Sequence, residues 1–343
     1  MNGLEREFVG LGPQMGWGSH LCQGFYCKPA GETPRVAFIA SHYNVDFSEH
    51  YLAEPLARRG FGFLGWNTRF RGAEGYFLLE PALQDIGEGV RWLREHGAEV
   101  VVLLGNSGGG SLLAAFQAET RAGDLYLSVA AHPGRPDVLT NWMDPAVLDE
   151  FDPTATDPAL DMYNPENGPP YSDEFVARYR EAQRARNRRI TAWAEAELER
   201  LRAAGFNDRL FTLQRTWADL RFVDPAIDPS DRPTPACYAG DPAHANRGVL
   251  GIGSLNTLRT WLSMWSLDRS RARGAGHYKV IDVPTLVVQA TMDAGVFPPD
   301  ARAIHDALAA TDKQLVELRG DHYFTGEREP LADALAHWVS DRV

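Results

Sequence analysis

The chain has little lysine and an excess of negative charge. Among its 343 residues only Lys28, Lys279 and Lys313 are lysines, and the net charge is −12. Nucleic-acid binding needs a basic face that displaces counterions from phosphates. The charge balance therefore argues against nucleic acid and against an anionic membrane surface as partners. It also gives no reason to expect a strongly anionic substrate.

Cysteine and long apolar runs are scarce as well. Cys22, Cys27 and Cys237 stand at irregular spacing, which is typical of neither a disulfide framework nor a zinc site. No run of about 18 uncharged apolar residues occurs, so no membrane span is expected. The segment Met1–Glu7 lacks the basic and apolar parts of a signal peptide. Together these absences predict a soluble, cytoplasmic protein.

Apolar runs and helical patterns alternate along much of the chain. The run 99–104 is the clearest strand, because it is apolar and β-branched throughout and suits the centre of a parallel sheet. The expected strands are 35–40, 61–66, 99–104, 125–131, 284–289 and 314–318, and the expected helices are 47–59, 78–96, 108–122, 298–310 and 330–343. This alternation predicts the α/β class, with a doubly wound, mostly parallel sheet.

The alternation is interrupted in the middle of the chain. Between about Trp142 and Tyr278 no buried parallel strand is expected, while 172–204 and 255–267 have helical patterns. The chain length fits a catalytic domain that carries a large insertion. We therefore expect one α/β domain over 1–141 and 279–343, with an inserted, mostly helical domain over 142–278.

One motif carries chemistry. The segment Gly105-Asn106-Ser107-Gly108-Gly109 matches G-x-S-x-G and lies between the clearest strand and a helix. Such a turn is sharp, needs small neighbours, and lifts the serine hydroxyl above the sheet. The first helical N–H groups, beginning with Gly108, then point at an oxyanion beside the serine. No G-K-[ST] follows, and the glycine spacing of a dinucleotide fingerprint is not matched.

A serine nucleophile needs a base, and the base needs an orienting acid. His322 follows the strand 314–318, and Asp293 follows the strand 284–289. Both would lie at the end of the sheet that carries Ser107. Asp321 is an alternative acid, but it is adjacent to His322 in sequence and its side chain is expected to point elsewhere. His132 ends the strand 125–131 and is expected to be a pocket or structural histidine.

The elbow, the late aspartate and the histidine after the next strand resemble the α/β-hydrolase superfamily over about 30–140 and 280–343. The resemblance implies that Ser107 attacks a carbonyl, that His322 is the base and that Asp293 orients it. It implies no cofactor, and it places the insertion where that family often carries a cap or lid. The expected activity is cleavage of a carboxylic ester, or a related acyl bond, of a mainly apolar small molecule through an acyl-enzyme.

Several alternatives stay open. A lactonase, an amidase or a carbon–carbon bond hydrolase could use the same triad, and a non-catalytic receptor could share the fold. Dehalogenases and epoxide hydrolases of this family are disfavoured, because they carry an aspartate where Ser107 stands. Many relatives have His-Gly after the first parallel strand. Here the sequence is His42-Tyr43-Asn44, so the second oxyanion donor is the N–H of either Tyr43 or Asn44, with His42 a candidate pocket residue.

The insertion offers aromatic residues and arginines. Trp261 and Trp265 are four apart in an expected helix and would share one face, either lining a substrate pocket or packing in the insertion's core. The arginines and glutamates of 172–204 indicate a solvated or subunit-facing surface, which leaves a homo-oligomer open. Aspartates at 224, 228 and 231 do not match a calcium loop, so no metal is expected.

Overall fold

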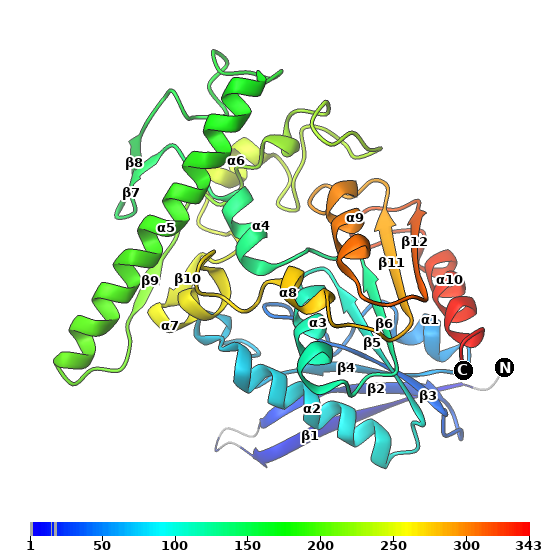
Figure 1. Ribbon diagram of the computed structural model, residues 1–343. Helices are drawn as coiled ribbons and strands as arrows, with labels where there is room; N and C mark the ends of the chain where they lie inside the picture. Colours follow the sequence, from blue (N-terminus) through cyan, green and yellow to red (C-terminus); the bar gives the residue numbers. More distant parts are fainter. Residues whose placement is uncertain (1–2, 15, 17–18) are drawn as a thin grey trace. The chain divides into compact units, whose positions relative to one another are not determined.

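A computed structural model describes residues 3–14, 16 and 19–343 (Figure 1). Met1 and Asn2, which begin the segment without signal-peptide features, lie outside the described residues. The chain divides into two compact units. The first comprises 1–73, 79–134 and 273–343, and the second comprises 74–78 and 135–272.

The first unit is built on a sheet. Its strands are β1 (Leu4–Gln14), β2 (His20–Pro29), β3 (Val36–Ala40), β4 (Gly62–Asn67), β5 (Val100–Asn106), β6 (Leu125–Val129), β11 (Thr285–Ala290) and β12 (Lys313–Leu318). Within the described residues the eight strands have the order β1-β2-β4-β3-β5-β6-β11-β12. Pairs that involve β2 are antiparallel, and all other neighbours are parallel. The predicted α/β class with a mostly parallel sheet is confirmed.

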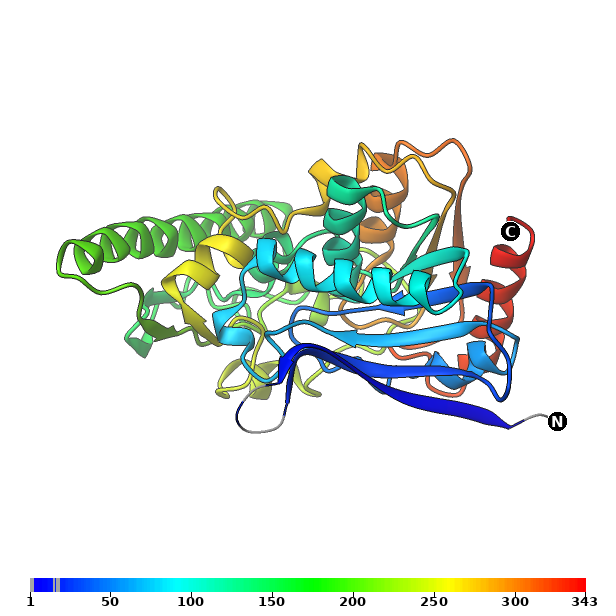
Figure 2. The same ribbon diagram turned by 90° about the horizontal axis from the view of Figure 1, so that it is seen from below.

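Helices cover both faces of this sheet (Figures 1 and 2). These helices are α1 (Ala53–Ala57), α2 (Leu79–Glu95), α3 (Gly109–Thr120), α8 (Gly274–Tyr278), α9 (Pro298–Ala307) and α10 (Arg328–Ser340). Helix α1 packs against α10, while α2, α3, α8 and α9 form a second group of contacts. Phe38, Leu104 and Val288 from three strands share one buried core with Trp338 of α10. The central strands are apolar on both sides because helices cover both sides.

The antiparallel start of the sheet was not predicted, and one predicted helix is much shorter. Strands β1 and β2 pair from Leu4 with Pro29 to Leu11 with Cys22. The helix predicted over 47–59 is confined to α1. Phe47 N–H donates to Asn67 Oδ1 at 2.9 Å, and this hydrogen bond holds the segment that precedes α1 in turns.

The second unit has one long helix and many short elements. Its elements are α4 (Arg135–Trp142), β7 (Val147–Asp149), β8 (Asp152–Thr156), α5 (Asp173–Ala203), β9 (Leu210–Thr212), α6 (Pro242–Asn246), β10 (Leu255–Thr257) and α7 (Leu258–Thr260), with single turns of 3₁₀-helix at 74–76 and 220–222 and a π-helical turn at 261–265. Helix α5 begins at the predicted place, where Ser172 Oγ accepts the N–H of Phe175 at 3.1 Å. The 255–267 segment is not the single helix expected from its pattern.

The unit limits lie several residues away from the predicted domain limits. The chain enters the second unit at Arg135 and leaves it at Ala272, and Arg135 N–H donates to Ala272 O at 3.0 Å. Gly134 and Arg273, on the first unit's side, form an antiparallel bridge. The short 74–78 segment belongs to the second unit because Thr260 Oγ1 donates to Gly75 O at 2.8 Å.

Candidate active site

Ser107 stands at a sharp turn between β5 and α3. Its φ of 56° is in the left-handed region, which costs a non-glycine residue free energy and persists only where neighbours fix it. Ser107 N–H donates to Val129 O at 3.2 Å. Its carbonyl oxygen accepts the N–H groups of Gly110 at 3.2 Å and His132 at 3.1 Å. The end of β6 therefore helps to hold the turn.

The glycines around the serine are sites of close backbone approach. A Cβ on Gly105 would lie 2.6 Å from Gly110 Cα, and one on Gly109 would lie 2.3 Å from Ser41 O. A Cβ on Gly110 would lie 2.5 Å from that of Ala131. The turn thus excludes a side chain at Gly105 and Gly109, as the motif predicts, and also at Gly110, which the motif does not specify.

Ser107, His322 and Asp293 form one chain of hydrogen bonds. His322 Nε2 lies 2.9 Å from Ser107 Oγ, and His322 Nδ1 lies 2.7 Å from Asp293 Oδ2. The other carboxylate oxygen, Asp293 Oδ1, accepts the N–H groups of Gly295 at 2.9 Å and Val296 at 3.0 Å. Asp293 and His322 are both buried. The three residues follow the ends of β5, β11 and β12; β11 and β12 are neighbours, and β6 lies between β5 and β11.

Asp321, the alternative acid, has its carboxylate in its own turn. Asp321 Oδ1 accepts the N–H groups of Tyr323 at 3.0 Å and Thr325 at 2.9 Å. Partial burial raises the pKa of Asp321, but the hydrogen bonds from Thr325 and Tyr323 outweigh it, and the net pKa is lowered. The side chain therefore serves the local turn, as its position next to His322 led us to expect.

The loop after β3 carries the two candidates for a second oxyanion donor. His42 Nδ1 accepts the N–H groups of Asn44 at 3.0 Å and Val45 at 3.1 Å, so its ring carries its proton on Nε2. The N–H of Asn44 is thereby directed into its own loop. The ring of Tyr43 is buried, and its hydroxyl oxygen lies 3.4 Å from Ser111 Oγ on α3.

The remaining candidate pocket residues fall into two groups. His132 follows β6, is buried, and has its ring centroid 6.1 Å from that of His322. Trp261 and Trp265 belong to the second unit and are buried. Trp261 Nε1 donates to Thr191 Oγ1 at 3.0 Å, and the guanidinium of Arg135 lies 4.6 Å from the ring centre of Trp265. Their packing favours the core interpretation over the pocket.

Sequence reasoning missed a buried pair behind the nucleophile. His50 Nε2 donates to Asn106 Oδ1 at 3.2 Å, because His50 Nδ1 accepts the N–H of Leu52 at 3.2 Å. Asn106 Nδ2 in turn donates to Val129 O at 2.9 Å. That carbonyl also accepts the N–H of Ser107. No sequence signal links an isolated histidine to a residue 56 positions away.

Stability should depend on the protonation of His50. Burial lowers the pKa of His50 from 6.5 to about 4. Above pH 6.5 the ring is neutral in both the folded and unfolded states, so its contribution is fully present. As pH falls toward 4, only the unfolded chain takes up the proton, and roughly 3 kcal/mol of the free energy of unfolding should be lost.

The matched variant is His50→Gln, whose amide can still donate to Asn106 but does not titrate. Urea unfolding at pH 7 and at pH 4.5 would give the free energy of unfolding of both proteins. We expect the wild type to lose about 2 kcal/mol more than the variant between these pH values. Equal losses would show that His50 does not contribute to the acid sensitivity.

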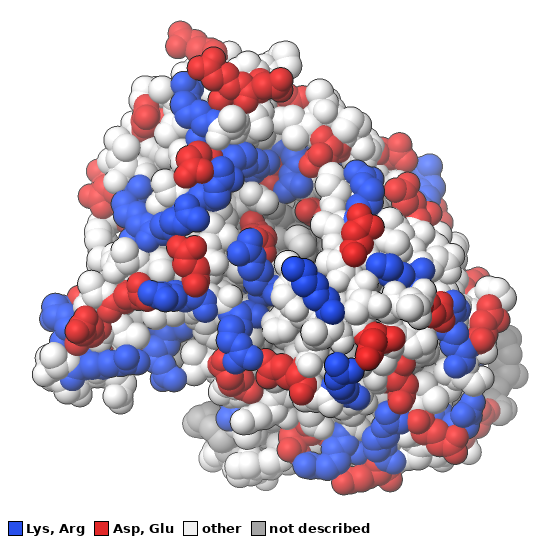
Figure 3. All heavy atoms as spheres, in the orientation of Figure 1, with Lys and Arg blue, Asp and Glu red and all other residues white. Residues whose placement is uncertain are grey.

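In the part of the chain that the structure describes, neither the charges on the face drawn in Figure 3 nor the grouping of metal-ligating side chains marks a further site. Arginines and acidic side chains are interspersed on the face drawn in Figure 3. Across residues 3–14, 16 and 19–343, no three His, Cys, Asp or Glu side chains gather as a metal site. In the same residues no helix has both the length and the apolar character needed to cross a membrane.

No protein-family model and no curated protein matches the chain. Solved structures do match it over nearly its whole length. The α/β hydrolase GrgF from Penicillium sp. sh18 is 14% identical, with a TM-score of 0.59 and 98% of each chain covered. The chain has the α/β-hydrolase fold. The esterase domain of a Rhodothermus marinus protein is 13% identical, with a TM-score of 0.51 and 97% of each chain covered.

A third solved structure is the monoacylglycerol lipase of Paleococcus ferrophilus. It is 16% identical, with a TM-score of 0.50, and the match covers 99% of this chain and 100% of the lipase. In the α/β-hydrolase fold the nucleophile stands on the turn from a central strand to a helix, and the acid and histidine follow later in the chain. Ser107, Asp293 and His322 occur in that order.

Proposed function

We propose that this chain is a serine hydrolase that cleaves a carboxylic ester of a mainly apolar small molecule. One observation carries the proposal: Ser107 Oγ, the imidazole of His322 and the carboxylate of Asp293 are joined by hydrogen bonds of 2.9 Å and 2.7 Å. A hydroxyl in contact with a buried, carboxylate-oriented imidazole is the arrangement that activates a serine near neutral pH.

The reaction then runs in two steps. Ser107 Oγ attacks the ester carbonyl while His322 Nε2 takes the hydroxyl proton, and Asp293 stabilises the imidazolium that forms. When the tetrahedral intermediate collapses, the bond to the leaving alcohol breaks and His322 returns the proton to that alcohol. In the second step water attacks the acyl-enzyme with His322 as base, and the carboxylic acid product leaves Ser107 free.

The oxyanion would be held by backbone N–H groups. Gly108, at the start of α3, supplies one of them. We assign the second to Tyr43 rather than Asn44, because the N–H of Asn44 donates to His42 Nδ1 within the loop. His42 and His132 are proposed to border the substrate near the reacting carbonyl, and His132 is supported by its ring distance of 6.1 Å from His322.

The ester, rather than a lactone, amide or carbon–carbon bond, is favoured by the structural neighbours, which include an esterase domain and a monoacylglycerol lipase. We further propose that the second unit acts as a cap that binds the apolar part of the substrate. In support of this, the bridge between Gly134 and Arg273 holds both connections to that unit just beyond the end of β6, and Ser107 O accepts the N–H of His132 there.

Labelling and a substrate panel test the proposal. The intact protein would be treated with a fluorophosphonate probe and then assayed on p-nitrophenyl esters of graded acyl length, with a lactone and an anilide beside them. We expect stoichiometric labelling and faster turnover of the esters. Failure to label would favour a non-catalytic receptor, and preference for the lactone or the anilide would replace the ester assignment.

A further inference from the structure

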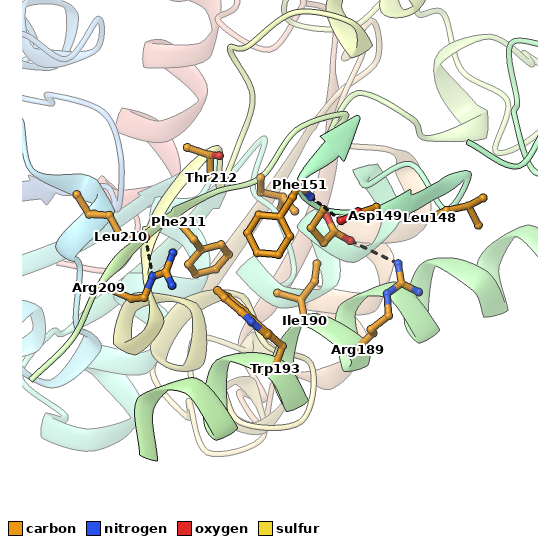
Figure 4. Close-up of a pocket in the computed structure, with 12 residues that line it drawn as sticks. Leu148, Asp149, Phe151, Arg189, Ile190, Trp193, Arg209, Leu210, Phe211 and Thr212 are labelled. Atoms are coloured by element: carbon orange, nitrogen blue, oxygen red, sulfur yellow. Dashed lines mark hydrogen bonds and ion pairs between the residues drawn. The ribbon is translucent and has the colours of Figure 1, made fainter. Parts of the chain in front are cut away.

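The second unit contains a cavity of its own. Its volume is about 520 Å³, within the range of small-molecule sites, which is roughly 300–1,000 Å³. It lies between the β7–β8 hairpin, helix α5 and strand β9, as Figure 4 shows. The lining residues are 148–151, 189, 190, 193 and 209–213. All of them belong to the second unit.

Three aromatic rings form a wall of this cavity (Figure 4). The rings of Phe151 and Trp193 are 6.1 Å apart at 78°, and those of Trp193 and Phe211 are 5.1 Å apart at 75°. These edge-to-face contacts arrange three rings from three different elements around one space. Phe151 is 74% exposed, so the apolar wall that it forms with the other two rings is open to a ligand from solvent.

The ion pair and hydrogen bonds of one buried arginine hold the elements around the cavity in place. Arg186 of α5 is almost fully buried and reaches Glu150 in the hairpin turn, with Nη2 to Oε2 at 2.6 Å. The same guanidinium donates to Asp144 O at 2.8 Å and to Gln214 O at 3.1 Å. One side chain therefore ties the hairpin, the helix and the segment after β9 together. A site held in this way is formed before a ligand arrives.

The lining of the cavity carries equal numbers of positive and negative side chains. Arg189 and Arg209 are matched in number by Asp149 and Glu150. Arg189 pairs with Glu150 at 3.4 Å, and Arg209 pairs with Glu197 on α5 at 3.0 Å. Asp149 Oδ1 accepts the N–H of Phe151 at 2.9 Å. Since each charged group already has a partner, a charged ligand would gain little here.

We propose that this cavity binds a flat, uncharged aromatic small molecule, at a site formed entirely by residues of the second unit. The ring system lies against Trp193 and between Phe151 and Phe211, and Ile190 and Leu213 complete the apolar lining. Burial of apolar area and edge contacts with the three rings supply the affinity. The site uses no residue of the first unit, so its occupancy does not depend on the proposed ester chemistry.

N-phenyl-1-naphthylamine is a suitable probe, because it is uncharged, consists of flat aromatic ring systems and fluoresces in apolar surroundings. Its matched comparator is 8-anilino-1-naphthalenesulfonate, which has the same ring framework and one negative charge. Full-length wild type, Phe151→Ala and Trp193→Ala would be titrated with both. Phe206→Ala is the control, since Phe206 is an exposed phenylalanine of the same unit, at 62%, that does not line the cavity.

We expect saturable binding of the neutral probe to the wild type and to Phe206→Ala, with at least about tenfold weaker binding to the other two variants. The sulfonate should bind the wild type more weakly than the neutral probe. Thermal unfolding checks each variant, and Phe151→Ala decides the matter if Trp193→Ala does not fold, because Phe151 is exposed. The probe contains no ester, so failure here is distinct from failure of the proposed hydrolase.

Three results would overturn the proposal. The first is equal affinity of the neutral probe for wild type and Phe151→Ala. The second is tighter binding of the sulfonate, which would make this an anion site. The third is sedimentation of the wild type as a dimer that Phe151→Ala converts to a monomer, which would mean that a second copy of the chain fills the cavity.

Discussion

Ser107→Ala is expected to lower kcat/KM for a p-nitrophenyl ester by about 10⁴-fold or more. The variant removes the atom that attacks the ester carbonyl in the first step of the proposed mechanism, while the glycines that shape the turn are retained. Any residual rate would come from the oxyanion donors and substrate binding acting on water. The measurement is steady-state kinetics together with fluorophosphonate labelling, which should be abolished.

A neighbouring serine provides the control. Ser111 is buried on α3, where its hydroxyl donates to Gly108 O at 3.4 Å and lies 3.4 Å from the Tyr43 hydroxyl oxygen. Ser111→Ala should keep most of the activity and all of the labelling. Near-normal turnover by Ser107→Ala, or loss of labelling in Ser111→Ala alone, would remove Ser107 from the nucleophile's role.

The parallel part of the sheet could be predicted because its strands carry their own signal. Strand β5 is apolar throughout since helices cover both faces of the sheet, and its run is visible without neighbours. Strand β1 has no such signal. It lies at the sheet edge, and of its eleven residues only Val9 is buried. The sequence of such an exposed edge strand carries little of the apolar pattern by which strands are predicted, and its pairing with β2 becomes known only from the fold.

The 255–267 segment shows how a helical pattern can mislead. Trp261 and Trp265 have the spacing of one face of an α-helix, but Ser266 N–H donates to Trp261 O at 2.9 Å, a bond over five residues. The turn is therefore π-helical and not part of the single α-helix that the pattern predicts. The tryptophans pack among residues of α4 and α5, which sequence spacing alone could not show.

Chain order was sufficient to nominate the candidate triad, because parallel strands bring their carboxyl ends to one edge of the sheet. Ser107, Asp293 and His322 each follow such a strand, so their proximity is a consequence of topology. The bond from His50 to Asn106 is different. It depends on the path of the turns between β3 and α1 and on the choice of one ring tautomer, which no local pattern encodes.

The identity of the acid is the sharpest remaining test of the mechanism. In Asp293→Asn the side-chain oxygen can keep the bonds from the N–H groups of Gly295 and Val296. The amide nitrogen then takes the place of Oδ2 and donates to His322 Nδ1. That ring nitrogen must become an acceptor, so the proton moves to Nε2, which can no longer accept the proton of Ser107.

We therefore expect Asp293→Asn to lower kcat on the order of 10⁴-fold, the size known for the same change in a serine protease triad, with a smaller effect on KM. Asp321→Asn is the matched control. Its side-chain oxygen can still accept the N–H groups of Tyr323 and Thr325, so its kcat should stay within about tenfold of the wild type. Both variants would be assayed on the same ester across pH 6 to 9. A larger loss in Asp321→Asn than in Asp293→Asn would transfer the acid's role to Asp321, because only the residue that orients His322 can control the tautomer that Ser107 requires.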